Sequence, residues 1–176
     1  MPLEILKYPH PVLAKKAAPV TKITPEIRQL AAEMAEAMYA NQGVGLAAPQ
    51  VGRSLRLVVI DLSGPEKREG LITLVNPVIT AASGEQEDEE GCLSVRDYRT
   101  NVRRAANVTV TALDLDGKAM EIEADALFAV CLQHEIDHLD GVLFIDRISR
   151  LKRAMYDKRV KRWTRQQQEQ ADRTGS

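Results

Sequence analysis

One short stretch of this sequence combines residue types that can bind a metal ion and move a proton. Residues 133–138 read QHEIDH, with two histidines four positions apart and a glutamate directly after the first. On a helix, residues i and i+4 share one face, so His134 and His138 can bind the same divalent ion. Glu135 can then act as general base on a water molecule at that ion. The stretch therefore predicts a metal site that can catalyse hydrolysis.

A surface helix that carries two histidines by chance is the alternative interpretation of this stretch. The chain has 3 histidines, and all but one of them lie here. The preceding residues 127–132 are strongly apolar, which favours a partly buried position, and Gly141 follows as a helix stop. These features favour metal binding over chance.

A catalytic metal site usually has three protein ligands and one open position, so a further ligand must come from elsewhere in the chain. His10 is the remaining histidine, but it lies in a proline-containing arm. Cys92 offers a thiolate, which suits a borderline-soft ion better than a carboxylate does, although a small buried cysteine is the commoner case. Cys131 lies one turn before His134. We interpret it as a pocket or core residue, with a structural zinc site of two cysteines and two histidines as the alternative.

The chain as a whole has the composition of a globular protein. It has 176 residues, of which 44% are hydrophobic, and we predict a single domain over residues 1–176. No apolar run approaches the ~18 residues that cross a membrane, and the N-terminus does not resemble a secretory signal. We therefore expect a cytoplasmic protein with unpaired cysteines. The net charge of −1 argues against DNA binding by the chain as a whole.

The elements that must position these residues indicate an α+β fold. Thr24 and Pro25 are typical of a helix start, and that helix is expected to end at Gly43 or at the preceding Asn41. A second helix, from the N-cap Asp125 to residue 138 or 139, carries the two histidines. Strand patterns occupy residues 55–60, 71–80, 108–113 and 120–123, and the acidic run 85–90 is interpreted as a loop. We predict two or three antiparallel sheets packed around the central histidine-bearing helix.

A third, basic helix is predicted over residues 149–165, after a core of about residues 1–148. Nine lysines or arginines lie between Arg147 and Arg165, with one aspartate. A solvated helix face is the ordinary explanation for this charge. We expect residues 166–176 to be a flexible polar tail.

Three segments together resemble the bacterial-type peptide deformylase family. Residues 43–50 read GVGLAAPQ, residues 90–94 read EGCLS, and residues 133–138 read QHEIDH. Their order and spacing are similar to those of the family's three motifs, and the resemblance extends from residue 5 to about residue 158. It implies a metal-dependent hydrolase that removes the N-formyl group from the formylmethionine of nascent polypeptides and releases formate.

The resemblance also implies the metal and its ligands. Cys92, His134 and His138 would bind the ion, and Glu135 would be general base and then general acid. The implied ion is Fe(II), which Zn, Ni or Co can replace in preparations. Ligand chemistry alone would favour zinc in a site of one cysteine and two histidines with an open position.

Further roles follow from the same resemblance. The Gln50 side chain and the backbone N–H of Leu93 would hold the developing oxyanion. Gly45 and Gly91 would lie where the substrate backbone docks as an added strand.

The resemblance further implies a methionine pocket and its mouth. The residues it implies there are Val44, Leu127, Val130, Cys131 and Arg99. Packing in the core is an equal alternative for Leu127 and Val130, and an ion pair with the acidic run is the alternative for Arg99.

The implied partners are formyl-Met nascent peptides and the ribosome. The basic C-terminal helix would contact ribosomal RNA through its phosphates, which gives salt-dependent affinity without sequence preference. Two other functions remain as alternatives at this point. One is a metallopeptidase of the His-Glu-x-x-His type, and the other is a non-catalytic RNA-binding domain with a structural metal.

Overall fold

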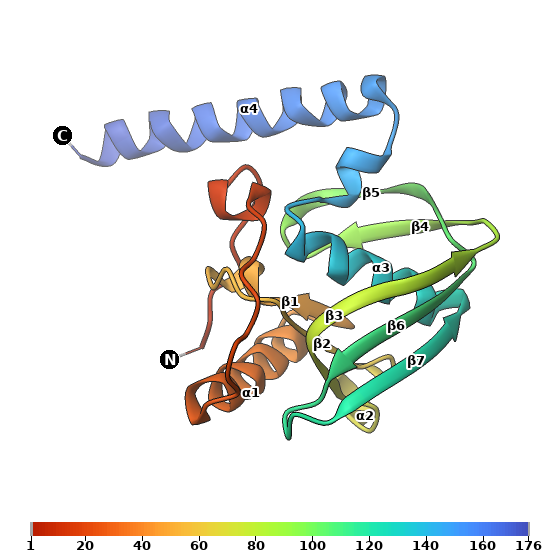
Figure 1. The fold of residues 1–176 in the computed structure, drawn as a ribbon. Helices are drawn as coiled ribbons and strands as arrows, with labels where there is room; N and C mark the ends of the chain where they lie inside the picture. The colour runs from red at the N-terminus through yellow and green to blue at the C-terminus, as the bar shows by residue number, and fades with distance from the viewer. Residues whose placement is uncertain (1, 176) are drawn as a thin grey trace.

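The computed structural model describes residues 2–175, which form four α-helices, three short 3-10 helices and seven strands (Figure 1). The helices are η1 (Pro11–Ala14), α1 (Pro25–Ala40), η2 (Ala48–Val51), α2 (Gly64–Lys67), α3 (Ala126–Leu139), η3 (Phe144–Arg147) and α4 (Arg150–Thr174). The strands are β1 (Gly45–Ala47), β2 (Leu57–Ile60), β3 (Ile72–Ser83), β4 (Gln86–Cys92), β5 (Val95–Arg104), β6 (Asn107–Leu113) and β7 (Ala119–Asp125).

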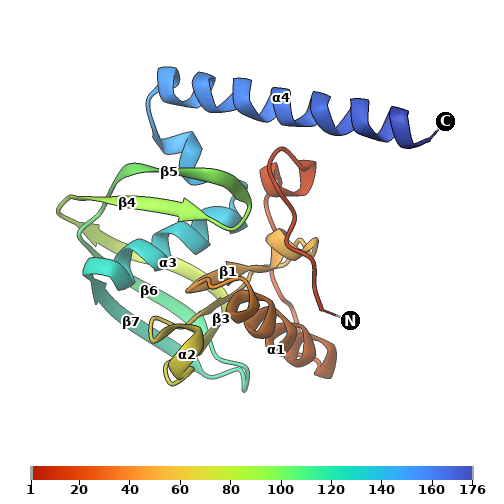
Figure 2. The same cartoon turned by 180° about the vertical axis from the view of Figure 1, so that it is seen from behind.

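Two antiparallel sheets enclose α3. The larger sheet has five strands in the order β1-β2-β3-β6-β7, and the smaller is the hairpin β4-β5. Figures 1 and 2 show α3 between the two sheets, with α4 lying beyond the hairpin on the outside. The prediction of antiparallel sheets around the histidine-bearing helix, with a C-terminal helix, is confirmed.

Local sequence signals explain where the main helices begin and end. The Thr24 hydroxyl accepts a hydrogen bond from the Ile27 N–H at 3.3 Å and so caps α1, as predicted. Helix α3 ends before Gly141, which adopts φ +76°, a conformation that favours glycine. A Cβ at Gly141 would lie 2.6 Å from the Ala14 carbonyl oxygen, so glycine also lets the N-terminal segment pack against the end of α3.

Helix α3 is apolar on the side that faces the large sheet. Ala129, Leu132, Ile136 and Leu139 are buried in one cluster with residues of β2, β3 and β6. The opposite side of the helix, which faces the β4-β5 hairpin, is therefore the side available to polar groups. This two-sided packing puts the histidines between helix and hairpin.

The interpretation of the acidic run 85–90 as a loop is wrong. Residues 86–90 form most of β4, where Glu87 is directly opposite Arg103 and Glu89 opposite Asn101. Strand propensity is low for acidic residues, so the single sequence gives little sign of a strand here. Cross-strand pairing with the basic residues of β5 decides the conformation instead.

The C-terminal helix α4 extends beyond the predicted end at residue 165 and reaches Thr174. The predicted tail is thus helical from 166 to 174, and Ser176 lies outside the described residues. Lysine, arginine, glutamine and alanine are good helix formers, which accounts for the continuation. Within residues 2–175, no helix is long and apolar enough to cross a membrane.

The first half of α4 is fixed to the body by an aromatic cluster. Tyr156 is 1% exposed, and its ring lies 4.8 Å from that of Tyr98 and 6.2 Å from those of Tyr8 and Trp163. Its hydroxyl donates a hydrogen bond to the Arg96 carbonyl at 2.9 Å. Helix α4 therefore packs through Tyr156 on the segment that begins β5.

We expect Tyr156→Ala to lower the free energy of unfolding by about 3–5 kcal/mol, because it leaves a cavity in this cluster. Leu151→Ala, at a position 71% exposed on the same helix, should change it by less than about 0.5 kcal/mol. Urea denaturation of both variants measures the difference. Equal losses would contradict the role of Tyr156.

Candidate metal centre

Three side chains from two distant segments converge between α3 and the hairpin. His134 and His138 project from α3, and Cys92 ends β4. Their candidate ligand atoms all lie within 4.8 Å of one another, and Cys92 Sγ is 3.4 Å from His138 Nε2. The structure therefore brings together the three residues that the sequence motifs indicate as ligands.

The donor set fits a catalytic divalent ion. One sulfur and two imidazole nitrogens suit zinc, iron, nickel or cobalt rather than a hard ion such as Mg²⁺. Among residues 2–175, this group consists of Cys92, His134 and His138, and no further histidine, cysteine or acidic residue belongs to it. His10 is outside it, since its Nδ1 accepts the Val12 N–H at 3.2 Å and its side chain caps η1. Three protein ligands are typical of a catalytic rather than a structural site.

Cys131 does not act as a fourth ligand beside Cys92 and the two histidines. It is 7% exposed, packs in the core cluster of the large sheet and also lines a cavity. Burial, reinforced by the charge of Glu135, raises the pKa of its thiol to about 12, so the thiolate that binds metals is disfavoured. Cys131 is therefore both a core residue and a pocket residue. The alternative in which it is a ligand of a structural zinc site is wrong.

A buried network of charges orients His134. His134 Nδ1 lies 2.9 Å from Glu90 Oε1, and Arg104 donates to both oxygens of Glu90 at 2.6 and 2.9 Å. A carboxylate only accepts, so Nδ1 carries the proton and Nε2 is left for the ion. Arg104 also donates to Asp137 at 2.9 Å, and Arg147 donates to the same carboxylate at 2.6 and 2.7 Å.

Sequence reasoning missed this network. Glu90 lies two residues before Cys92 and Asp137 lies between the two histidines, and this closeness to the candidate ligands was the available signal. Nothing in the sequence indicates that Arg104 belongs to the site, because only the fold brings it to Glu90. Its side chain is 2% exposed, so it is a fully buried cation.

The network also sets the protonation of the groups around the site. Burial raises the pKa of Glu90, but hydrogen bonds from His134 and Arg104 bring it below its ordinary value, so Glu90 is ionised. Burial, reinforced by repulsion from His134, lowers the pKa of His138 well below its usual range. Burial opposes charge on His134 as well, but Cys92 and Glu90 raise its pKa well above the usual value.

Glu135 is a buried carboxylate with one unused oxygen. It is 4% exposed, its Oε1 lies 3.8 Å from His134 Nε2, and Oε2 has no hydrogen-bond partner among the described residues. Burial raises the pKa of Glu135 to about 7. Such a group can take and return a proton near neutral pH.

Gly45 makes room for Glu135. A Cβ at Gly45 would lie 3.0 Å from Glu135 Cγ and Cδ, closer than side-chain contacts normally are. The glycine in β1 is thus required by space, since its backbone conformation is an ordinary one. This places the predicted Gly45 directly against the predicted base.

Gln50, Leu93 and Ser94 form what we call the cradle, beside the sulfur of Cys92. The Ala47 N–H donates to Gln50 Oε1 at 2.9 Å, which turns the amide NH2 towards the hairpin. Gln50 Nε2 donates to Ser94 Oγ at 3.0 Å and, more weakly, to Cys92 Sγ at 3.6 Å. Leu93 and Ser94 form the two-residue turn of the β4-β5 hairpin. Ser94 is a further residue that sequence reasoning missed.

A cavity of about 560 Å³ opens at this site. All the predicted site residues except the buried His138 line it. Leu127, 58% exposed, is at the rim and not in the core, whereas Val130 is a buried wall residue. Val44 is half-buried against the core of the large sheet. The cavity is therefore largely apolar where it leaves the metal ligands.

Arg99 lies at the mouth of this cavity and pairs with the acidic strand. Its Nε donates to Glu89 Oε1 at 2.8 Å, and both side chains are more than half exposed. A Cβ at Gly91 would lie 2.7 Å from Arg99 Nη1, so the guanidinium covers Gly91. Both interpretations of Arg99, mouth residue and partner of the acidic run, describe its position.

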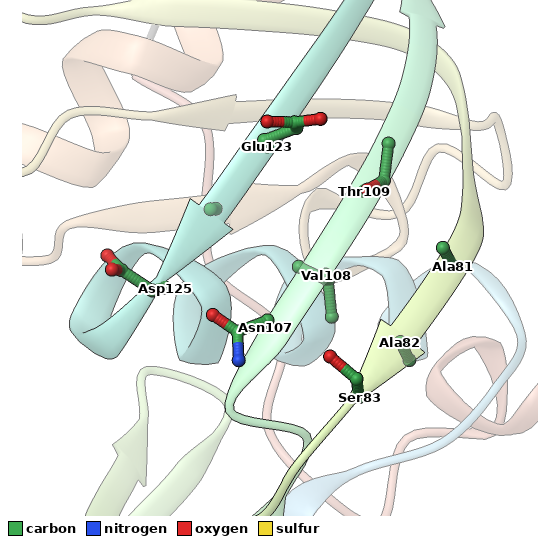
Figure 3. Close-up of a pocket in the computed structure, with 9 residues that line it drawn as sticks. Ala81, Ala82, Ser83, Asn107, Val108, Thr109, Glu123 and Asp125 are labelled. Carbon is green, nitrogen blue, oxygen red and sulfur yellow. The ribbon is translucent and has the colours of Figure 1, made fainter.

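A second cavity, of about 390 Å³, lies on the outer face of β3, β6 and β7. Figure 3 shows Asn107, Glu123 and Asp125 around it, with α3 behind the strands. None of its lining residues is a histidine, a cysteine or a predicted site residue. The chemistry-bearing residues thus belong to the other cavity.

The chain matches known proteins over most of its length. The family model described as polypeptide deformylase matches residues 2–154. A peptide deformylase of Thermodesulfovibrio yellowstonii is 51% identical over 159 residues, which are 90% of this chain and 96% of that relative. The crystal structure of a Legionella pneumophila peptide deformylase has a TM-score of 0.87 and 47% identity, over 95% of this chain and 98% of that one. An Acinetobacter baumannii peptide deformylase structure with Met-Ala-Ser bound has a TM-score of 0.78 and 37% identity, over 84% and 99% of the two chains.

Replacement of Glu90 should disturb both the fold and the metal site. We expect Glu90→Gln to destabilise the protein by about 3–5 kcal/mol, because Arg104 loses its buried partner. Metal affinity should fall about 10–100-fold, because His134 loses the carboxylate that orients it. Chemical denaturation and a metal-competition titration measure the two effects.

The neighbouring Glu89 provides the matched control for Glu90. Its side chain is exposed, and among residues 2–175 its one ion pair is with Arg99 at the surface, so Glu89→Gln should cost less than about 1 kcal/mol and leave metal affinity unchanged. Similar results for the two variants would mean that burial of the Glu90 pair has no special role.

The two cysteines should respond differently to substitution. We expect Cys92→Ser to lose tightly bound metal, and Cys131→Ser to retain it, because only Cys92 lies within reach of both histidines. Elemental analysis of protein purified without oxygen measures the metal per chain. Retention of metal by Cys92→Ser would rule out the proposed ligand set.

Proposed function

Because this chain belongs to the polypeptide deformylase family, whose members are metal-dependent hydrolases that remove N-formyl groups from nascent peptides, we propose that it performs that reaction in the cavity described above. The observation that carries the proposal is the unpartnered Oε2 of buried Glu135, next to a cysteine and two histidines. An unused buried carboxylate oxygen is costly to maintain. A structural metal site, as in the RNA-binding alternative, has no need of it.

Cys92, His134 and His138 would hold one divalent ion. A bound ion of this kind supplies Lewis acidity, which polarises the formyl carbonyl and makes water more acidic. The contribution of the chain would be to bring the three ligand atoms together and to orient His134 through Glu90 and Arg104.

Glu135 would carry the proton. Its Oε2 accepts a proton from the water that attacks the formyl carbon, and then gives it to the nitrogen of the leaving methionine as the C–N bond breaks. The products are formate and a free amino terminus. A pKa near 7 allows both transfers at neutral pH, and Gly45 leaves the space in which the carboxyl group sits.

Gln50 and Leu93 would stabilise the charge that develops on the formyl oxygen. The Gln50 NH2 is fixed by Ala47 and Ser94, and its weak contact with Cys92 Sγ can be exchanged for a stronger one to an oxyanion. The Leu93 N–H lies in the adjacent turn. Each donor of this type is worth roughly 2.7–4 kcal/mol in a transition state.

The substrate would be a formyl-Met peptide. Its backbone would extend along β4 at Gly91, and its methionine side chain would lie against Val130, Cys131 and Leu127. The Acinetobacter baumannii relative binds Met-Ala-Ser, the product expected from such a substrate. A metallopeptidase is disfavoured, because the proposed third ligand, Cys92, is an upstream cysteine and the Gln50 donor of the cradle lies beside its sulfur.

We propose Fe(II) as the native ion, on the basis of the family resemblance of the three motifs. A sulfur and two nitrogens bind ferrous ion as well as zinc, nickel or cobalt. Elemental analysis of anaerobically purified wild-type protein identifies the ion, and zinc as the sole metal there would contradict this proposal.

We expect Glu135→Gln to reduce kcat for formyl-Met-Ala-Ser about 10²–10⁴-fold, because the proton carrier is lost. The metal content should be unchanged, because Glu135 is not one of the three ligands. Release of free amine measures the rate. Glu123→Gln, on the outer face of the large sheet, is the control and should behave as wild type. No amine release by metal-loaded wild-type protein would contradict the proposed function.

The C-terminal helix supports a second part of the proposal, contact with the ribosome in the bacterial cytoplasm. Lys158, Lys161, Arg162 and Arg165 are exposed on α4, and no hydrogen bond or ion pair engages them within residues 2–175. Free cations on a projecting helix suit the phosphates of ribosomal RNA. Nascent peptides emerge from the ribosome, so contact there would raise the local substrate concentration.

Reversal of charge on α4 tests this contact without damage to the core. The variant Lys158→Glu, Lys161→Glu, Arg165→Glu should lose salt-dependent co-sedimentation with ribosomes and keep kcat/KM for short peptides within about 2-fold. The control exchanges the same residues between lysine and arginine and should bind normally. Undiminished co-sedimentation of the charge-reversed protein would rule out this role of α4.

A further inference from the structure

The N-terminal arm, which we define as residues 5–8, contacts all three residues of the cradle. The Leu6 N–H donates to the Gln50 carbonyl at 2.7 Å, and the Tyr8 N–H donates to the Ser94 carbonyl at 2.8 Å. Between them, the Lys7 ammonium group donates to the Leu93 carbonyl. Three consecutive residues of the arm thus bind the backbone of the proposed oxyanion donors and their neighbour.

The arm is itself fixed on both sides of Lys7. Ile5 is buried in the core cluster that contains α1. Tyr8 packs in the aromatic cluster with Tyr156, and its hydroxyl donates to Asp157 Oδ1 at 2.7 Å. The backbone of Lys7 is therefore held in place on both sides. From this position its side chain reaches the turn at Leu93.

Lys7 differs from its two neighbours in the kind of contact it makes. The bonds from Leu6 and Tyr8 use backbone N–H groups, which almost any residue would supply. The bond from Lys7 uses a charged side chain that is exposed to solvent. An exposed lysine gives up rotamer freedom to make such a bond, which offsets part of what the bond contributes to stability.

The acceptor of this bond lies at a sensitive point. Leu93 is the first residue of the two-residue turn between β4 and β5, so its carbonyl lies outside the ladder of paired residues. The same residue supplies the N–H that we assign to the oxyanion. The N–H and the carbonyl of Leu93 belong to successive peptide groups joined at the Leu93 Cα, so a carbonyl held in place restricts the rotation that would turn the N–H away. Preorganised donors are the effective ones.

We propose that Lys7 is a positioning residue for deformylation: its ammonium group holds the Leu93 carbonyl and thereby keeps the Leu93 N–H directed at the developing oxyanion. This inference rests on the proposed function. Lys7 is not among the residues that line the cavity. Its effect passes through the Leu93 backbone, so it acts on the transition state and not on substrate binding.

The test compares Lys7→Met with Lys16→Met. Methionine retains most of the lysine stem and lacks the donor, and Lys16 is an exposed lysine further along the N-terminal segment without a hydrogen bond or ion pair in residues 2–175. We expect Lys7→Met to lower kcat for formyl-Met-Ala-Ser about 5–20-fold, less than the 10²–10³-fold of a lost oxyanion donor. KM, metal content and melting temperature should stay at the values of Lys16→Met, and Lys7→Arg should restore most of kcat.

A second measurement does not depend on the reaction. In ¹⁵N-labelled protein, the Leu93 and Ser94 amides should exchange with solvent faster in Lys7→Met than in wild type or Lys16→Met, because the turn is released. Unaltered exchange, a kcat equal to that of Lys16→Met, or a loss of kcat matched by a loss of metal would each overturn the positioning role. Inactive wild-type protein would overturn the proposed function, and this inference with it.

Discussion

The site depends on one buried cation, Arg104. It comes from the end of β5, and it binds Glu90 on β4 and Asp137 on α3 at the same time. A buried guanidinium without partners would cost several kcal/mol, so hairpin and helix are stable only when they meet at this residue. Glu90 in turn holds His134, and Cys92 follows Glu90 by two residues. The ion pair therefore sets the distance between the sulfur and the imidazole nitrogens.

The same packing of α3 between sheet and hairpin raises the pKa of the Glu135 carboxyl group, so that it can accept a proton near neutral pH. Helix α3 gives its apolar side to the large sheet and its polar side to the hairpin, which leaves Glu135 enclosed, with His134 beside its Oε1 and no hydrogen-bond donor to its Oε2 among the described residues. Burial raises the pKa of Glu135 to about 7, although His134 and Arg104 both act to lower it, and Arg104 makes its hydrogen bonds to Glu90 and Asp137 instead. Two carboxylates of one site are thus held in different protonation ranges, one by a paired cation and one by burial.

Much of the fold and part of the site could be predicted from local sequence. Caps, turn residues and apolar spacing indicated α1, α3, the start of α4 and the β6-β7 hairpin. The i, i+4 spacing put both histidines and Glu135 on one helix, and the three motifs indicated Cys92 and Gln50. Strand β4 was missed because glutamate and aspartate are poor strand formers, and the full length of α4 was missed because polar residues without apolar spacing resemble a tail.

The sequence by itself determined the residue types of the chemistry and the helix that carries them, because those depend on contacts within one or two turns. Only the tertiary structure brought the sulfur of Cys92 to the histidines, kept Cys131 in the wall of the cavity, and placed Arg104 and Lys7 against the hairpin. These contacts join residues far apart in the chain. No periodicity links such residues, and their pairing is selected by the burial of charge and apolar surface when the whole chain folds.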